Sequence, residues 1–255
     1  IISRKANWAE QHPEIWWENL CKATQLLLAK TAVAPHSIQS IGIAYQMHGL
    51  VLVDRHQKLL RDSIIWCDSR AVEIGNDAAQ EIGEKKYGTH LLNAPGNFTA
   101  SKLKWVKENE PTIYAQAAYY MLPGDYIAFR MTGEMKTTVS GLSEGIMWDA
   151  KNETISHELL KHYGISESLL CSTVSQFGEQ GFVTPQAAEA LGISANIPVS
   201  YRAGDQPNNA FSLNVLQPGE LAATAGTSGV IYGILDQIVT DPANRVNLFA
   251  HVNHQ

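Results

Sequence analysis

The sequence predicts an α/β protein, with short apolar strands alternating with amphipathic helices. Two observations support this fold class. Apolar runs of strand length occur at residues 38–44, 50–53 and 197–199, and each leads into a polar turn or loop. Segments with helical spacing of apolar residues lie between these runs, and several have proline at their start and glycine just past their end.

In the first half of the chain, apolar spacing and helix breakers define the expected elements. Pro13 suits the first turn of a helix that also contains Trp17 as a core residue. The expected apolar face of this helix consists of Trp16, Leu20, Ala23 and Leu27. Strands are expected at 38–44, 50–53 and 64–66. Helices are expected at 70–82, closed by Gly83, and at 102–109, capped from residues 99–101 and stopped by Pro111.

The same apolar spacing and helix breakers define the elements expected in the second half of the chain. A helix is expected from residue 122 to 132, ended by Gly133, and an edge strand at 136–140. Helices at 157–163 and 186–191 end at Gly164 and Gly192, and a strand at 197–199 follows. Two further strands flank the turn that begins at Gly226, and residues 246–252 have the apolar character of a strand.

Composition narrows the class of protein. The chain has 255 residues, which is enough for one large domain or two smaller ones. A net charge of −6, with no cluster of Lys and Arg, argues against a nucleic-acid partner. No apolar run approaches the roughly 20 residues of a membrane span. The three cysteines are far apart and form no Cys-x-x-Cys, so they suggest neither a disulfide framework nor a thiolate metal site and fit a reduced, cytoplasmic setting.

One carboxylate and one small-residue turn stand out as candidate chemistry. Asp205 follows Gly204, which permits close approach of the backbone to a ligand. About twenty residues later, Gly226, Thr227 and Ser228 form a turn whose N–H and O–H groups can cradle a phosphate. The acid could accept a proton from an alcohol while the turn holds the phosphoryl donor. Read separately, each motif is more often an ordinary turn or hairpin.

Polar and aromatic side chains also gather where the early strands end. His48 and Gln46 follow one strand, and Trp66 with the Asp68–Arg70 pair follows another. Ligands of open α/β sheets bind at strand ends. This set offers fixed donors and acceptors beside an apolar wall, as a polyhydroxylated sugar requires. The alternatives are an ordinary loop histidine at position 48 and a core tryptophan at position 66.

Two weaker motifs point elsewhere. Residues 141–145 match the Gly-x-Ser-x-Gly nucleophile elbow of hydrolases, but that motif needs a buried strand before it and a helix after it. The polar segment before it and the residues 146–149 after it fit neither. His251 and His254 could pair on a metal only if they lay on a helix, and a loop is expected there.

Taken together, the motifs resemble the FGGY family of carbohydrate kinases, and within it the xylulose branch. The resemblance spans nearly the whole chain and rests on many short motifs that follow one another in the family's order. They are Trp8–Gln11, Trp16–Trp17, Gln46–Gly49, Trp66–Arg70, Phe98–Leu103, Leu122–Tyr126, Met131–Glu134, Met147–Asp149, Gly204–Asp205 and Gly226–Gly229.

The resemblance implies an actin-like ATPase fold built from two ribonuclease-H-like α/β domains. Residues 1–202 would form an N-terminal sugar-binding domain without its first strands, and 203–255 the beginning of a truncated nucleotide-binding domain. The implied activity transfers phosphate from ATP, with Mg²⁺, to D-xylulose, giving D-xylulose 5-phosphate. Asp205 would be the general base. The implied sugar-binding residues are Met47, His48, Trp66, Asp205 and Gln206, and the implied phosphate-binding residues are Gly226, Thr227 and Ser228.

The chain also departs from the family pattern. The Asp-x-Gly phosphate and magnesium turn of the family's opening strand does not precede Trp8, and most of the second domain does not follow Gln255. A fragment that is inactive by itself is therefore expected, with no metal-ligating residue assigned. Partners would be a sugar and ATP, with a homodimer possible. The alternatives are another sugar or polyol kinase of the family, or a non-catalytic sugar-binding or regulatory domain.

Overall fold

The protein is described by a computed structural model that covers residues 1–225, 229–241 and 245–253. Its helices are α1 (Pro13–Lys30), η1 (Pro35–Ser37), α2 (Val72–Ile82), α3 (Glu84–His90), α4 (Thr99–Asn109), α5 (Pro111–Gln116), α6 (Pro123–Thr132), α7 (Val139–Glu144), α8 (His157–Tyr163), η2 (Glu167–Leu169), α9 (Pro185–Leu191) and α10 (Asp205–Ser212). Its strands are β1 (Glu10–Gln11), β2 (Ile41–Tyr45), β3 (Val51–Val53), β4 (Ser63–Ile64), β5 (Tyr119–Met121), β6 (Lys136–Thr138), β7 (Trp148–Asp149), β8 (Thr154–Ile155), β9 (Ser172–Val174), β10 (Val199–Gly204), β11 (Leu221–Ala225) and β12 (Gly229–Gly233).

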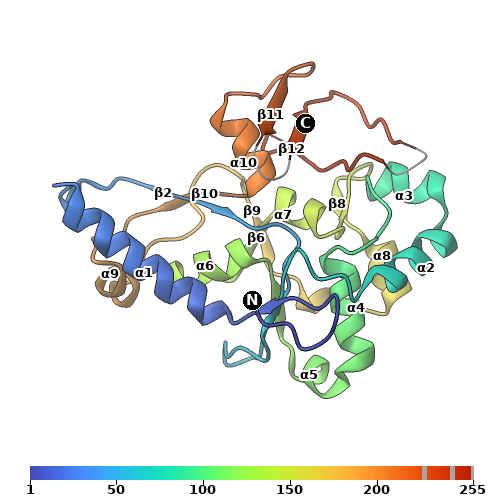
Figure 1. Ribbon diagram of the computed structural model, residues 1–255, viewed down its shortest axis with the longest axis horizontal. Coiled ribbons are helices and arrows are strands. Elements are labelled where there is room, and N and C mark those ends of the chain that lie inside the picture. The colour runs from blue at the N-terminus through green and yellow to red at the C-terminus, as the bar shows by residue number, and fades with distance from the viewer. Residues whose placement is uncertain (226–228, 242–244, 254–255) are drawn as a thin grey trace.

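The parallel pair β2 and β10 joins parts of the chain that are far apart in sequence. Gly204 pairs with Tyr45 at the last position of both strands. Because the strands are parallel, the residues that follow Tyr45 and the residues that follow Gly204 emerge at the same edge. In Figure 1, α1, α6 and α9 lie on one side of this pair, and α10, β11 and β12 lie on the other.

Helix α1 begins at Pro13, as predicted, but only the first half of its predicted apolar face is covered, because Trp16 and Leu20 are partly buried and pack against core residues. Leu27 is 60% exposed and Ala23 is also exposed, whereas Trp17 is buried. Helices α6 and α9 pack beside Trp17 and Cys21, so the buried stripe is rotated relative to the predicted one. A regular spacing identifies a helix, but its tertiary neighbours decide which of two adjacent stripes is covered.

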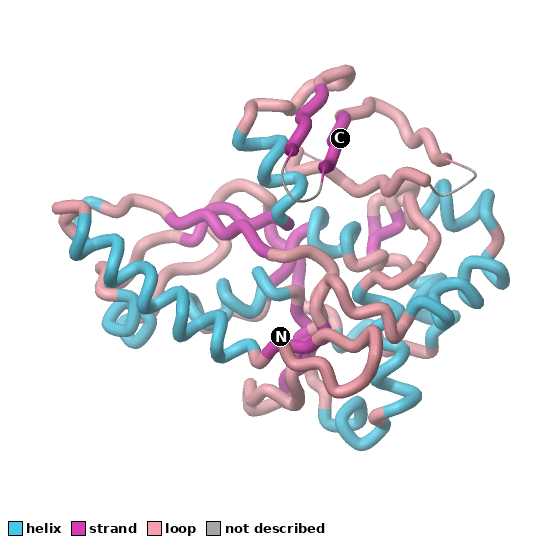
Figure 2. Tube along the Cα trace, viewed as in Figure 1, coloured by secondary structure: helices cyan, strands magenta, loops and turns pink. Residues whose placement is uncertain are grey.

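A second core lies under α2, α3, α4, α7 and α8. Figure 2 shows this part of the molecule as mainly helical, with short strands between the helices. Its buried members include Leu50 just before β3, Leu52 in β3, Leu103 and Val106 on α4, and Leu159 on α8. The core holds α4 and α7 beneath the loop that follows β2.

The C-terminal part contains an antiparallel pair of strands and, after it, a segment that contacts the body of the molecule. Strands β11 and β12 pair antiparallel, with Ala225 opposite Gly229, as expected for the segments that flank residues 226–228. The segment predicted as a strand at 246–252 is not one. Instead, the Leu248 N–H donates to Asn93 Oδ1 at 2.9 Å, and the Ala250 N–H donates to Ser143 Oγ at 2.9 Å. Polar groups of the body therefore pair with its backbone in place of a sheet partner.

Helix ends agree best with the sequence. Gly133, Gly164 and Gly192 adopt left-handed backbone angles at the ends of α6, α8 and α9, as predicted. The cap predicted for α4 is wrong, because Thr99 lies inside the helix and its hydroxyl donates to Gly49 O. The Gly-x-Ser-x-Gly segment lies largely in α7, so the hydrolase elbow has the wrong context. Within the described residues, no helix combines the length and apolar character needed to cross a bilayer.

Candidate functional site

Asp205 lies where β10 ends and α10 begins. The sequence predicted a turn, and the structure places this acid as the first residue of an eight-residue helix. Its side chain reaches the surface, yet the surrounding protein raises its pKa through burial, while hydrogen bonds from the backbone and from Gln206 act in the opposite direction. Gln206 is the second residue of α10 and is partly buried. Asp205 is therefore an accessible carboxylate whose environment makes it a better proton acceptor than a fully solvated one.

Two other segments meet Gly204 at the base of Asp205. A Cβ at this position would lie 2.4 Å from Met47 Cγ and 2.6 Å from Glu144 Oε2. Only glycine permits both contacts. The end of β2, the end of α7 and the start of α10 thus converge on one point, and Met47 lies beside Gly204, the residue directly before Asp205.

His48 is held in a single orientation beside the place where β2, α7 and α10 meet. Its Nδ1 donates to the Glu144 carbonyl oxygen at 3.0 Å, since a carbonyl can only accept. The ring packs against Phe98 and Phe249, with centroids 4.7 and 5.4 Å away. Burial, and then the nearby Lys102 ammonium, lower its pKa from 6.5 to about 3. The imidazole is therefore neutral near pH 7, and its Nε2 is an acceptor.

This pKa predicts how stability responds to acid. The unfolded chain binds a proton at histidine more readily than the folded chain does, so stability is lost as pH falls from about 6.5 toward 3. Each tenfold difference in proton affinity corresponds to about 1.4 kcal/mol. His48→Asn keeps a donor near the Nδ1 position and cannot titrate, so its loss of stability with acid should be shallower. Urea unfolding between pH 4 and 7 measures the difference.

The exposed His36 provides the control for this prediction. The His36→Asn variant should follow the pH dependence of the unsubstituted protein. Parallel curves for His48→Asn and the unsubstituted protein would contradict the buried, neutral state of His48.

Glu144 is a residue of this site that the sequence did not reveal. Its side chain is 1% exposed, and neither carboxyl oxygen has a hydrogen-bond partner of good geometry among the described residues. Burial first, and then the charges of Asp125 and Asp205, raise its pKa well above the ordinary value. The local pattern of residues 141–145 gives no sign that this acid would be buried. A buried acid without a counter-charge is costly, and such groups concentrate at functional sites.

Lys102 connects the loop that carries His48 to the loop that carries Trp66. Its Nζ donates to His48 O at 2.8 Å and to Ile65 O at 3.1 Å. Burial lowers its pKa to about 8, and the nearby Asp68 opposes this change. Trp66 follows Ile65 directly, and its side chain is 61% exposed rather than part of the core. The predicted indole is therefore accessible on a loop that shares an anchor with the His48 loop.

The Asp68–Arg70 pair does not face a ligand, which corrects the sequence interpretation. Both side chains are almost fully buried, and Arg70 Nη2 lies 2.7 Å from Asp68 Oδ2. Arg70 also pairs with Glu10 at 2.9 Å and lies over the Trp8 ring at 3.8 Å. These charged groups pair with one another inside the protein, so neither side chain of the pair is exposed to a sugar hydroxyl.

The remaining predicted groups have mixed outcomes. Gly226, Thr227 and Ser228 lie outside the described residues, as does His254. His251 is buried, and its Nδ1 lies 3.1 Å from Tyr232 Oη, in a loop rather than on a helix. Across the described ranges, no group of three or more His, Cys, Asp or Glu side chains could hold a metal ion.

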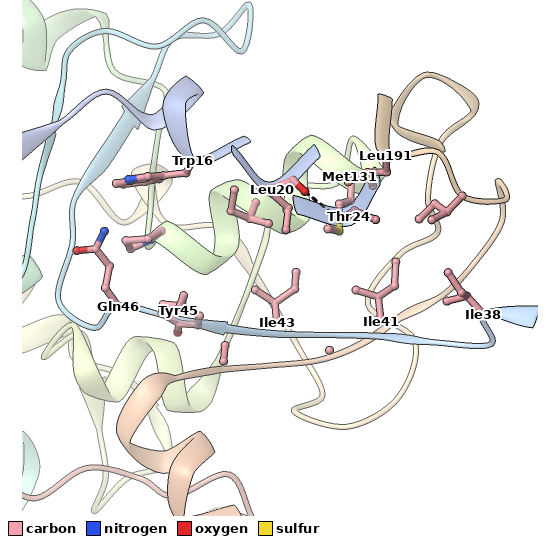
Figure 3. A pocket seen from close by; sticks show the side chains of 15 residues that line it. Trp16, Leu20, Thr24, Ile38, Ile41, Ile43, Tyr45, Gln46, Met131 and Leu191 are labelled. Atoms are coloured by element: carbon pink, nitrogen blue, oxygen red, sulfur yellow. Dashed lines mark hydrogen bonds between the residues drawn. The ribbon is translucent and has the colours of Figure 1, made fainter. Parts of the chain in front are cut away.

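A cavity of about 400 Å³ lies between α1, β2, α6 and α9. Figure 3 shows apolar side chains around it, including Ile41, Ile43 and Leu20, with Gln46 near one end. Gln46 Nε2 donates to Gln11 Oε1 at 3.1 Å. Because its walls are mainly apolar, this cavity does not suit a polyhydroxylated ligand as well as the polar edge at Asp205 does.

Comparison with known proteins places the chain in a family. Residues 1–212 match the N-terminal domain of the FGGY family of carbohydrate kinases. Xylulose kinase from Bacillus subtilis (strain 168) is 31% identical over 257 residues, covering 98% of this chain and 50% of the relative. Xylulose kinase from Escherichia coli (strain K12) is 31% identical over 245 residues, covering 96% and 50%. The chain thus spans about half the length of the curated relatives it matches.

Solved structures agree on the fold. The crystal structure of a xyloylose kinase from Brucella ovis superposes with a TM-score of 0.89 at 28% identity, covering 98% of this chain and 51% of that one. A xylulose kinase from Rhodospirillum rubrum gives the same TM-score at 24% identity and covers 99% and 51%. The predicted actin-like ATPase fold is confirmed. By the extent of the sequence match and the shared fold, this chain belongs to the FGGY family of carbohydrate kinases.

Proposed function

We propose that the protein takes part in phosphorylation of a ketopentose by ATP, with D-xylulose as the substrate and D-xylulose 5-phosphate as the product. The observation that carries this proposal is the convergence of Met47, His48 and Asp205 where β2 and β10 end. Membership of a carbohydrate-kinase family, and relatives named xylulose kinase, support the substrate class.

In this proposal Asp205 is the general base. A sugar hydroxyl attacks the γ-phosphorus of ATP, the bond to the bridging oxygen of ADP breaks, and Asp205 accepts the hydroxyl proton. The protein contributes mainly by positioning, because little covalent chemistry is required of it. The raised pKa of Asp205 suits this role, since it increases proton affinity at an accessible carboxylate.

The other proposed site residues hold the sugar. His48 presents its neutral Nε2 as an acceptor for one hydroxyl, and Met47 and the exposed Trp66 supply apolar contact with the carbon skeleton. Gln206 supplies an amide next to Asp205. We assign Gly226, Thr227 and Ser228 to the ATP phosphates, and we place the domain boundary between 202 and 203.

Mg²⁺ accompanies ATP in this proposal, but the described residues do not by themselves fit a metal site. No three potential ligands among them cluster. The roles given to Asp205, His48 and Gln206 therefore involve no metal-bound step.

Binding of D-xylulose tests the sugar site directly. His48→Ala should weaken the affinity by about 10–100-fold, because a buried hydrogen bond lost without replacement costs about 1–3 kcal/mol. Isothermal titration calorimetry measures this, with His36→Ala as an exposed control. Equal affinity of the His48→Ala and unsubstituted proteins, with the fold intact, would contradict the assignment.

A further inference from the structure

Lys102 is a fully buried cation whose partners are all backbone carbonyls. It lies on α4 and is 0% exposed. No Asp or Glu oxygen among the described residues lies within 4.0 Å of its Nζ, which instead donates to His48 O and Ile65 O. Burying an ammonium without a carboxylate is costly, whereas an apolar side chain of similar length would fill the same space without that cost.

The two carbonyls belong to the two loops that carry the proposed sugar-facing side chains. His48 has φ +60°, a left-handed conformation that is unfavourable for a residue other than glycine, so its backbone needs support from outside the loop. Ile65 is the residue directly before Trp66. One ammonium thus fixes the backbone of His48 and the backbone next to Trp66 relative to each other.

We propose that Lys102 is a positioning residue of the sugar site, which sets the spacing and orientation of His48 and Trp66 by binding both loops at once. This inference rests on the sugar site proposed above. Lys102 touches no substrate in this role, because its side chain is buried beneath the loops.

The two loops should respond differently when Lys102 is replaced by Met, which has nearly the same length and no charge. Ile65 O keeps a hydrogen bond from the Asp68 N–H at 3.1 Å. His48 O has no second hydrogen bond among the described residues. The His48 loop should therefore relax from its left-handed conformation. D-xylulose affinity should fall about 10–100-fold.

Lys107 offers a matched control on the same helix. Its Nζ donates to the carbonyl oxygens of Tyr163 and Gly164, so it also binds two backbone carbonyls, but in a loop remote from Asp205 in the sequence and carrying no proposed site residue. Lys107→Met should raise amide exchange around residues 163–165 and leave sugar affinity unchanged. Lys102→Met should raise exchange around residues 46–50.

A double-mutant cycle separates positioning from a merely structural role. If Lys102 acts through His48 and Trp66, the loss of sugar affinity on Lys102→Met should shrink several-fold in the His48→Ala and Trp66→Ala backgrounds. Calorimetry on each single and double variant gives the coupling. Equal losses in all three backgrounds, or equal sugar affinity for Lys102→Met and Lys107→Met, would overturn the inference.

Failure of the proposed function gives a different pattern. If the unsubstituted protein binds neither D-xylulose nor related ketopentoses, the sugar site itself is refuted, and the inference about Lys102 falls with it. Increased exchange at residues 46–50 in Lys102→Met would then assign Lys102 to loop structure alone.

Discussion

In the completed enzyme, Asp205→Asn is expected to lower kcat by about 10²–10⁴-fold while sugar and ATP affinities stay within a few-fold, because this is the usual contribution of a general base. Asparagine keeps the size and hydrogen-bonding capacity of the side chain but cannot accept the proton. The attacking alcohol is only partly deprotonated in a loose transition state, so a modestly raised pKa, as found here, is sufficient for the base. Steady-state assays coupled to ADP release measure kcat and both KM values.

Two further variants make this prediction specific. Asp205→Glu should also be slow, because one added methylene moves the carboxylate past the hydroxyl that it must meet. Asp77→Asn, on an exposed position of α2, should leave kcat unchanged. If Asp205→Asn instead lowers the melting temperature sharply while the remaining folded enzyme turns over normally, Asp205 supports the start of α10 and is not the base.

The sequence predicted the parts of this site that depend on local order along the chain. Asp205 after a strand, and Met47 and His48 after another, follow from apolar runs that end in polar residues. Parallel pairing of β2 with β10 then brings these two strand ends together. Glu144 and Lys102 were missed because their importance arises only from tertiary contacts across about 60 and 54 positions of sequence, to Gly204 and to His48 respectively.

Helix ends and helix faces show the same contrast between features that local sequence determines and features that tertiary packing determines. The glycines that end α6, α8 and α9 act through their own backbone angles, so they can be identified without knowing the fold. The buried face of α1 depends on where α6 and α9 pack, and there the prediction held for Trp16 and Leu20 but not for Ala23 and Leu27. Residues 246–252 have the composition of a strand but find polar partners at Asn93 and Ser143 in place of a neighbouring strand.

The Asp68–Arg70 pair gives the largest expected effect on stability. Arg70→Met should lower the free energy of unfolding by about 3–5 kcal/mol, the usual result of removing one partner of a buried ion pair. Asp68 is 0% exposed and would keep only backbone donors, including the Ala9 N–H at 2.6 Å. Stacking of the guanidinium over Trp8 would also be lost. Urea unfolding near pH 7 measures the change.

Arg70→Lys should recover little of this stability, because an ammonium can neither bind a carboxylate in the two-pronged manner of arginine nor stack as a plane on indole. Arg4→Met is the surface control, since Arg4 pairs with the same Glu10 at 2.9 Å but is 60% exposed. Its loss should cost about 1 kcal/mol or less. D-xylulose affinity of folded Arg70→Met should remain close to that of the unsubstituted protein, because Arg70 faces other protein groups. A small change in unfolding free energy together with a large loss of sugar affinity would instead place this pair in the sugar site, as the sequence first indicated.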